Sequence, residues 1–309
     1  RIGETADAII ASPPDVLVII DSPDFTHRVA KRVRAKLPQL PIIDYVSPTV
    51  WAWRPGRARK MRAYVDHLLA LLPFEPQVHE RLGGPRTTYV GHPLIERVTE
   101  FRPASDEAQL RNTKPPTVLI LPGSRRAEIE RLLDLFGETA QQLVERVGEV
   151  DFVLPAVSHL KDIIEARIAH WPCKVRLVFG EDEKLKAFRQ ARAALAASGT
   201  VSLELALAQV PMVIAYRVGK VEEWIVRALA TAPSIVLPNL ILGEKVIPEF
   251  LQEDASPSTL SKALAQLIGD TPTREAQLAA LTKLDDVMKL PDGQSPSALC
   301  AQIILSYVK

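Results

Sequence analysis

The sequence predicts an α/β protein of two domains, each built around a parallel β-sheet. A length of 309 residues with 47% hydrophobic side chains exceeds the usual size of one domain and supplies apolar material for two cores. From Val16 onwards, short apolar runs rich in β-formers alternate with longer amphipathic stretches, as is typical of repeated βα units. A polar, proline-containing stretch interrupts this alternation and separates the two halves.

The first half predicts a domain over residues 1–113. Its short apolar runs predict strands, and the amphipathic stretches between them predict helices centred near Ala30, Arg59 and Val78. The strands are expected at Val16–Asp21, Ile42–Val46, His67–Leu72 and Thr87–Val90. The polar stretch Glu100–Pro116 then predicts a linker that contains a short helix.

The second half predicts a domain over residues 114–285 with the same alternation. Its strands are expected at Val118–Leu121, Phe152–Pro155, Val175–Phe179, Ala194–Ala197, Met212–Tyr216 and Ile235–Leu237. Its helices are expected at Ala127–Val147, Leu185–Ala191 and Glu222–Ala230. From Pro257 the pattern predicts three helices divided by Pro272 and Pro291, and the last stretch, 286–309, is a candidate to pack back on the first domain.

Composition excludes several classes of function. Thirty-eight basic residues against 37 acidic residues leave a net charge of +1, which gives no electrostatic case for a nucleic-acid partner. Cys173 and Cys300 lie far apart without metal-ligand spacing, which favours a reducing compartment. The sequence has neither an apolar run long enough for a membrane-spanning helix nor a signal peptide at Arg1–Ala11. The expected location is the cytoplasm, with any membrane contact peripheral.

A loop after the first strand of the second half predicts a phosphate site. The sequence contains neither the GxGxxG dinucleotide pattern nor a P-loop, so phosphate binding needs another device. Gly123 permits close backbone approach, and Ser124, Arg125 and Arg126 open a long helix whose free amides and cations suit a diphosphate. The alternative is a plain strand-to-helix turn, with Ser124 as the cap and the arginines solvated.

A second loop of the same kind strengthens the prediction of a nucleotide site. Ser198, Gly199 and Thr200 again lie between a strand and a helix, and Glu204 one turn later is placed to accept both ribose hydroxyls. The alternative is that Ser198 or Thr200 caps the helix while Glu204 favours its positive end. Asn239 after Pro238 could contact a base or sugar, although asparagine there is also ordinary turn chemistry.

The first half contains candidate acid and base groups. Asp21 and Asp24 lie at the end of a predicted strand, where a carboxylate could take the proton of an acceptor hydroxyl. The structural alternative is a helix start, with Asp21 or Ser22 as the N-cap and Pro23 at the first helical position. His92 also follows a strand and is a candidate acid, base or phosphate ligand, although most lone histidines serve packing or hydrogen bonding.

Aromatic residues stand beside a cluster of cations in the first half. Trp51 and Trp53 precede Arg54 and Arg57, and Arg59, Lys60 and Arg62 complete five cations within nine residues. This pattern predicts contact with an anion, either a lipid headgroup at an anionic membrane or a phosphorylated acceptor. The alternative is a solvated helix face beside two core tryptophans.

Taken together, these segments resemble the lipid-A-disaccharide synthase family. The resemblance covers nearly all of residues 12–255 and is specific because many distinct motifs occur in the family's order. The matching motifs are Asp21-Ser-Pro-Asp-Phe, Tyr45-Val-Ser-Pro-Thr-Val-Trp-Ala-Trp-Arg, Pro73-Phe-Glu-Pro, Val90-Gly-His-Pro-Leu, Leu121-Pro-Gly-Ser-Arg-Arg, Ala197-Ser-Gly-Thr with Glu204, and Leu237-Pro-Asn-Leu.

The resemblance implies the GT-B architecture, in which two Rossmann-like domains face a cleft. It also implies transfer of 2,3-diacylglucosamine from UDP to 2,3-diacylglucosamine 1-phosphate, giving a β-1,6-linked disaccharide. Because the donor is α-linked and the product β-linked, the reaction inverts the anomeric centre and needs a base, for which Asp21, Asp24 and His92 are the candidates. No metal and no cofactor are implied, since helix-end amides and cations can neutralise the leaving diphosphate.

Two departures from the family pattern keep other functions open. The sequence lacks the family's usual first strand and its Gly-Glu-x-Ser-Gly-Asp segment, so the first domain is expected to be incomplete at its N-terminus, and an inactive fragment is one of the alternatives. Thr26 also stands where the family often has asparagine. The alternatives are another GT-B enzyme of UDP-sugars, such as a peptidoglycan-precursor transferase or an epimerase, and a non-catalytic nucleotide-binding fragment. The expected partners are the two sugar substrates, the inner face of an anionic inner membrane and, as an open possibility, a second copy of the chain.

Overall fold

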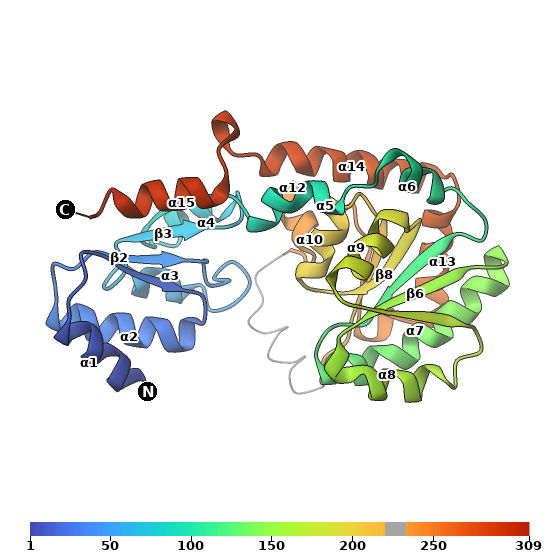
Figure 1. The fold of residues 1–309 in the computed structure, drawn as a ribbon, viewed down its shortest axis with the longest axis horizontal. Helices are drawn as coiled ribbons and strands as arrows, with labels where there is room; N and C mark the ends of the chain where they lie inside the picture. Colours follow the sequence, from blue (N-terminus) through green and yellow to red (C-terminus); the bar gives the residue numbers. More distant parts are fainter. Residues whose placement is uncertain (220–232, 309) are drawn as a thin grey trace. The chain divides into compact units, whose positions relative to one another are not determined.

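A computed structural model describes residues 1–219 and 233–308, and the chain divides into two compact units (Figure 1). Of the described residues, unit 1 comprises 1–96 and 288–308, and unit 2 comprises 97–219 and 233–287. Residues 97–113, assigned to the first domain from sequence, group with unit 2 because α5 (Val98–Phe101) and α6 (Ser105–Leu110) pack there on α9 (Glu181–Gln190). The helix expected at Glu222–Ala230 lies outside the described residues.

Unit 1 contains a parallel sheet in the order β1-β2-β3-β4, which confirms the four strands expected in the first half. Helices follow the strands in a βα series, so consecutive strands pair side by side. The strands are β1 (Leu17–Ile20), β2 (Ile42–Tyr45), β3 (His67–Ala70) and β4 (Arg86–Tyr89), and the helices are α1 (Ile2–Ala11), α2 (Pro23–Lys36), α3 (Gly56–Met61), α4 (Glu75–Arg81) and α15 (Pro296–Leu305). No helix was expected at α1, which packs on α2.

The strands of unit 1 bury both faces, because alternate residues point to opposite sides of a strand. Ile42 and Leu68 join a core formed with α1 and α2, whereas their neighbours Ile43 and Leu69 join a second core with Cys300 of α15. The hydroxyl of Tyr307 also lies 3.1 Å from Nδ1 of His67. The C-terminal helix therefore covers the sheet face opposite α2 (Figure 1).

Unit 2 contains a six-stranded parallel sheet in the order β10-β9-β8-β5-β6-β7. Five of its six expected strands are present, and β10 pairs with β9 at one edge. The strands are β5 (Thr117–Leu121), β6 (Asp151–Ala156), β7 (Val175–Phe179), β8 (Ala193–Ala197), β9 (Met212–Tyr216) and β10 (Glu249–Leu251). The other helices are α7 (Arg126–Val147), α8 (Lys161–Ile168), α10 (Thr200–Leu207), α12 (Leu237–Leu242), α13 (Pro257–Ile268) and α14 (Pro272–Met288).

The expected strand at Ile235–Leu237 is wrong, because α12 begins at Leu237. Pro238 lies in the first turn of this helix, where the fixed φ of proline favours helix initiation and its missing N–H has no partner to lose. The short apolar run before Pro238 is therefore the approach to a helix rather than a strand.

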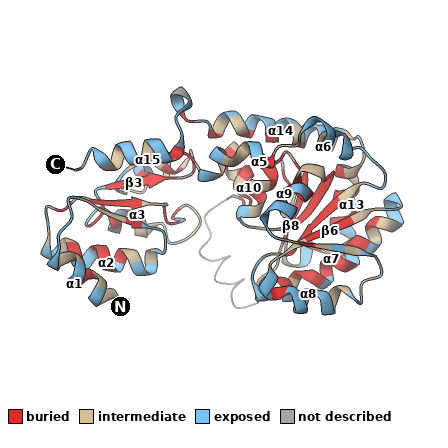
Figure 2. Cartoon of the chain, in the orientation of Figure 1, coloured by how far each residue is buried: buried red, intermediate tan, exposed pale blue. Residues whose placement is uncertain are grey.

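The core of unit 2 lies between the sheet and the paired helices α7 and α13, where the buried faces of these elements meet (Figure 2). Phe136 of α7 and Leu264 of α13 belong to one buried cluster with Val118, Phe152 and Leu195 of the strands. Close packing of this cluster fixes the strand ends and hence the loops that follow them.

The order of the strands creates a topological switch point between β5 and β8. From β5 the chain moves outward through β6 and β7, then returns to the other side of β5 as β8 and moves outward again through β9 and β10. The loops after β5 and β8 therefore leave neighbouring strands in opposite directions. In open α/β sheets this is where ligands bind.

Candidate active site

A cavity of about 380 Å³ in unit 2 lies at this switch point, and we call it the switch-point cavity. It is lined by the loop after β5, the end of β6, α9, and the loop between β8 and α10. The structure therefore brings together the two loops that the sequence singled out. The predicted residues that line it are Gly123, Ser124, Arg125, Ser198, Gly199, Thr200 and Glu204.

The loop after β5 already binds a carboxylate from its own chain. Glu128 accepts hydrogen bonds from the backbone N–H of Ser124 (3.1 Å) and of Arg125 (3.3 Å), and from the guanidinium of Arg125 (2.9 Å). Gly123 has φ +111°, and a Cβ added there would lie 2.3 Å from a carboxylate oxygen of Glu128. The amides suit an anion, as predicted, but they are not free, so a diphosphate that used them would displace Glu128.

The two arginines of this loop have different roles. Arg125 lines the cavity with its side chain 83% exposed, whereas Arg126 pairs with Glu130 at 2.8 Å and does not line the cavity. Arg126 and Glu130 are four residues apart on α7, a spacing that favours an ion pair on the helix surface. The structure thus supports the solvated alternative for Arg126 and leaves Arg125 as the cation available to a ligand.

The loop after β8 offers backbone amides more than hydroxyl donors. The hydroxyl of Ser198 donates to the carbonyl of Ile235 at 2.7 Å, so its proton is engaged within unit 2. Gly199, at φ +151°, ends the loop directly before α10, and Thr200 is the exposed first residue of that helix. The first N–H groups of a helix have no partner inside it, so this turn presents donors to the cavity.

Glu204 has a partner that the sequence analysis missed. Its carboxylate lies 2.8 Å from Nζ of Lys184 on α9, and both side chains line the switch-point cavity. Glu181 lies farther from the same ammonium, at 3.6 Å. No local pattern signals Lys184, because it reaches the cavity from a helix 20 residues before Glu204. It adds a mobile cation to Arg125 within the same cavity.

Asn239 does not line the switch-point cavity and is engaged in holding its own segment. It is 2% exposed, and its amide group donates to the carbonyl of Ile247 at 2.9 Å. Its carbonyl oxygen accepts from the N–H groups of Val246 (3.1 Å) and Ile247 (2.9 Å). This arrangement supports the structural alternative given for Asn239, and its assignment to the donor site stays a prediction.

Replacing Asn239 by alanine is expected to destabilise unit 2 without weakening nucleotide binding. The variant leaves buried backbone groups unpaired, which costs about 1–3 kcal/mol. Thermal melts measure the stability, and UDP titrations below the melting temperature measure the affinity. A folded variant that bound UDP much more weakly than the parent chain would return Asn239 to the binding site.

Asp21 and Asp24 occupy different positions at the end of β1. Asp21 and Ser22 both have left-handed backbone conformations, φ 48° and φ 49°, which are uncommon outside glycine and costly to hold. Asp21 is fixed through its backbone, where its carbonyl accepts from the hydroxyl of Thr26 at 2.6 Å. Asp24 lies in the first turn of α2, 91% exposed, and pairs with Arg57 at 3.2 Å. The strained turn thus presents two accessible carboxylates in unit 1.

His92 lies in unit 1 in a partly buried position. Its Nδ1 accepts a hydrogen bond from the N–H of Leu94 at 3.2 Å, and burial lowers its pKa to about 4. The imidazole is therefore neutral above that pH. Because Nδ1 is engaged, Nε2 carries the proton, so His92 suits a hydrogen-bonding role, and a role as base would require Nδ1 to release the N–H of Leu94.

The two tryptophans beside the basic cluster are held differently. The indole N–H of Trp51 donates to Glu75 at 3.1 Å, and the Trp51 ring packs edge-to-face on Phe74 at 5.5 Å. Glu75 is buried, which raises its pKa to about 7. Trp53 instead stacks with the exposed guanidinium of Arg54 at 5.1 Å. Trp53 with Arg54 therefore forms the exposed part of this motif, and Trp51 anchors it.

A buried polar network in unit 1 also escaped the sequence analysis. Nε2 of His27 lies 3.0 Å from the carboxylate of Asp44, and Nδ1 lies 3.2 Å from the hydroxyl of Tyr64. Asp44 is fully buried in β2, and desolvation raises its pKa. A charged residue inside an apolar strand was the available signal for this network.

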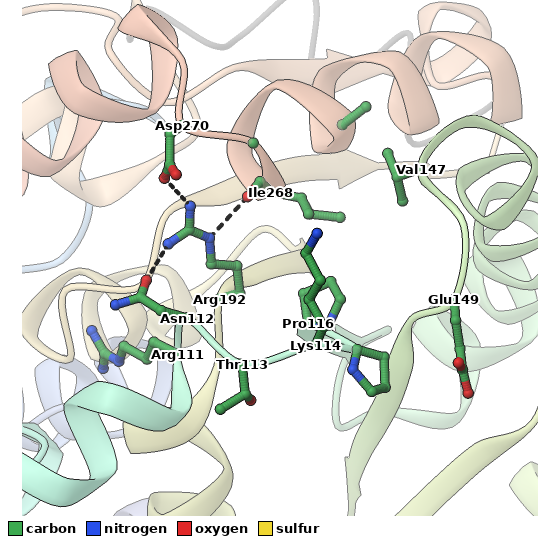
Figure 3. A pocket seen from close by; sticks show the side chains of 13 residues that line it. Arg111, Asn112, Thr113, Lys114, Pro116, Val147, Glu149, Arg192, Ile268 and Asp270 are labelled. Carbon is green, nitrogen blue, oxygen red and sulfur yellow. Dashed lines mark hydrogen bonds and ion pairs between the residues drawn. The ribbon is translucent and has the colours of Figure 1, made fainter.

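Another cavity, of about 690 Å³, lies in unit 2 at the opposite edge of the sheet (Figure 3). It surrounds the residues that precede β5, β6 and β8, so it is at the amino ends of the strands. Its central cation, Arg192, is 7% exposed and bonds to Asn112 (2.6 Å), to the carbonyl of Ile268 (2.9 Å) and to Asp270 (Figure 3). The guanidinium of Arg192 forms all of these bonds within the chain, so we interpret this cavity as structural.

Across residues 1–219 and 233–308, no group of three or more histidine, cysteine, aspartate or glutamate side chains is placed to hold a metal ion. Within the same part of the chain, every helix is too short or too polar to cross a bilayer.

Residues 1–302 match the family model described as lipid-A-disaccharide synthetase. The lipid-A-disaccharide synthase of Nitrobacter winogradskyi is 57% identical over 310 residues, which cover 100% of this chain and 78% of the relative. The lipid-A-disaccharide synthase of Rhodopseudomonas palustris strain HaA2 is 52% identical over 309 residues, with the same two shares.

Solved structures of low sequence identity share the fold. Anabaena HepE in complex with UDP and glucose matches with a TM-score of 0.57 and 12% identity, over 99% of this chain and 80% of that one. A putative UDP-N-acetylglucosamine 2-epimerase from Listeria monocytogenes matches with a TM-score of 0.63 and 12% identity, over 98% and 76%. These matches confirm the expected α/β class with two Rossmann-like domains.

Proposed function

The chain belongs to the lipid-A-disaccharide synthetase family and is therefore a glycosyltransferase, and we propose that it moves 2,3-diacylglucosamine from UDP to 2,3-diacylglucosamine 1-phosphate. The products are UDP and a β-1,6-linked disaccharide. The observation that supports this proposal most is the switch-point cavity, where two helix-opening loops, Arg125, Lys184 and Glu204 meet.

We assign the UDP of the donor to unit 2. Arg125, Lys184 and the first N–H groups of α10 suit the diphosphate, because cations and helix-end amides stabilise the charge that grows on a leaving group. The carboxylate of Glu204 accepts hydrogen bonds from the two ribose hydroxyls. This assignment requires Lys184 and Glu128 to exchange their present partners for the ligand.

The transfer needs a base on the acceptor side, which we assign to unit 1. The acceptor's 6-hydroxyl oxygen attacks the anomeric carbon, the bond from that carbon to the diphosphate oxygen breaks, and UDP leaves with the electron pair. Asp24 or Asp21 takes the hydroxyl proton, and direct displacement inverts the anomeric centre. We favour Asp24 because it lies in the wall of a cavity of unit 1, as described below.

A transfer assay tests this function directly. The chain is incubated with UDP-2,3-diacylglucosamine and 2,3-diacylglucosamine 1-phosphate, and both UDP and the anomeric configuration of the disaccharide are measured by NMR. The enzyme from Nitrobacter winogradskyi serves as the positive control. Release of UDP without a disaccharide, or epimerisation of a UDP-sugar, would favour one of the alternative functions.

We propose peripheral attachment to the inner face of an anionic inner membrane through Trp51, Trp53 and the cations 54–62. Trp53 with Arg54, and the exposed Arg59, supply the outer part of this surface. The chain is expected to float with phosphatidylglycerol vesicles at low salt and to dissociate as salt screens the charges. Arg59→Gln should float less than the parent chain. Flotation that did not depend on salt would contradict the electrostatic part of the proposal, and sedimentation of the same samples measures whether the chain forms a homodimer.

A further inference from the structure

A second cavity, in unit 1, has a strongly cationic wall, and we call it the cationic cavity. It has a volume of about 460 Å³ and is formed by residues of α2 and of the segment 54–64. Asp24 is the one carboxylate among the residues that line it. The cations that line it are Arg28, Lys31, Arg54, Arg57 and Lys60.

Two helices direct these cations to one place. Arg28 and Lys31 are three residues apart on α2, and Arg57 and Lys60 have the same spacing on α3, so each pair shares one helix face. Arg59 and Arg62 belong to the same basic run but do not line the cavity. Of the basic run 54–62, the fold therefore places Arg54, Arg57 and Lys60 at the cavity and the other two cations outside it.

Most of these cations lack a carboxylate partner. Arg57 pairs with Asp24, Lys31 lies 4.9 Å from the ring centre of Tyr64, and Arg54 stacks on Trp53. In the part of the chain that the structure describes, no ion pair joins Arg28, Lys31, Arg54 or Lys60 to an acidic side chain. Like charges that share a cavity repel one another, and an anion between them removes that repulsion.

The floor of the cavity is polar and fixed. His27 and Tyr64 both line it, and both ring nitrogens of His27 are engaged, one by Asp44 and the other by Tyr64. This network holds α2 against β2 and the segment after α3. The network therefore fixes the backbone of the segments that carry the cations.

We propose that the cationic cavity binds a phosphate monoester, the 1-phosphate of the acceptor sugar. A monoester has two negative charges and three terminal oxygens, which match several cations better than the single charge of a phosphodiester headgroup. Asp24 shares this wall, so a sugar held here by its phosphate keeps its hydroxyls near the proposed base. This assignment rests on the proposed function and adds Arg28, Lys31 and Lys60 to the acceptor site.

Calorimetric titration with glucosamine 1-phosphate and with glucosamine tests the site without lipid or membrane. The parent chain is expected to bind the phosphate at least tenfold more tightly than the plain sugar, with an affinity that falls as salt rises. Lys60→Gln and Arg28→Gln should each weaken the phosphate about 5- to 30-fold, because each removes a charge-assisted contact from an exposed site. Lys36→Gln, on α2 but outside the cavity, is the matched control and should bind like the parent chain.

Three results would overturn the assignment. The first is equal binding of glucosamine 1-phosphate and glucosamine by the parent chain. The second is equal phosphate affinity in Lys60→Gln and Lys36→Gln, with melts showing both folded. The third is that Lys60→Gln no longer binds phosphatidylglycerol vesicles but binds glucosamine 1-phosphate as tightly as the parent chain, which would identify a site for lipid headgroups instead.

The transfer assay and a UDP titration separate this inference from the proposed function. Phosphate binding that depends on Lys60, in a chain without transfer activity, supports the cationic cavity and contradicts the proposed function. If the chain is active, a raised acceptor KM and an unchanged donor KM in Lys60→Gln support both the cationic cavity and the proposed function. Equal acceptor KM values in Lys60→Gln and Lys36→Gln contradict the cationic cavity but not the proposed function.

Discussion

Asp24→Asn is expected to lower turnover by about 10²- to 10⁴-fold while UDP affinity stays within a few-fold of the parent chain. Asparagine keeps the size of the side chain but cannot take the proton of the acceptor hydroxyl, and general-base help is worth about this factor. The loss of stability should be small, because the pair with Arg57 is exposed and such pairs contribute about 0–1 kcal/mol. Transfer kinetics, thermal melts and UDP titrations on the same preparation measure the three quantities.

Asp21→Asn is the matched control for this prediction. Asp21 is held through its backbone and does not line the cationic cavity, so its variant should retain more activity than Asp24→Asn. The reverse order would move the base to Asp21. Near-parent turnover in both variants would exclude the pair and make neutral His92 the next candidate.

Glu204→Ala is expected to weaken UDP about 10- to 150-fold. Hydrogen bonds from ribose hydroxyls to a carboxylate are charge-assisted and contribute about 1.5–3 kcal/mol, and 1.4 kcal/mol corresponds to a factor of ten. The variant also frees Lys184, which reduces the loss if that ammonium turns to the diphosphate. Titration calorimetry with UDP and with uracil shows whether the ribose and diphosphate are the parts being recognised.

Glu181→Ala provides the control for the charge on Lys184. Glu181 lies 3.6 Å from the same ammonium but does not line the switch-point cavity, so its removal should leave UDP affinity near that of the parent chain. If Glu204→Ala bound UDP as tightly as Glu181→Ala does, Glu204 would have no part in the site.

The sequence predicted the structure best where an apolar run forms a strand and polar residues follow it directly. Four strands of unit 1 and five of unit 2 stand where apolar runs predicted them, because buried parallel strands have near-continuous apolar stretches. Gly123 and Thr200 were found because each lies in a polar loop directly after such a run.

Contacts between distant segments could not be predicted from local patterns. Lys184 is an ordinary residue of an amphipathic helix in the sequence, and only the structure shows its ion pair with Glu204 of α10. Likewise, only the structure shows that Glu128 binds the amides of the loop after β5. The partners of Asn239 could not be predicted either, because a polar residue after an apolar run gives no local sign of what it contacts. The side-chain amide of Asn239 forms hydrogen bonds with the backbone of residues 246–247.

The central claim is that UDP binds at the carboxyl edge of the unit 2 sheet. Hydrogen–deuterium exchange with and without saturating UDP tests it most directly, because bound phosphate protects the amides that it accepts from. We expect slower exchange in residues 123–128 and 198–204, and no change in residues 111–116 and 265–270 around the cavity at the opposite edge. Protection confined to the opposite-edge segments, with exchange at 123–128 and 198–204 unaltered, would contradict the account.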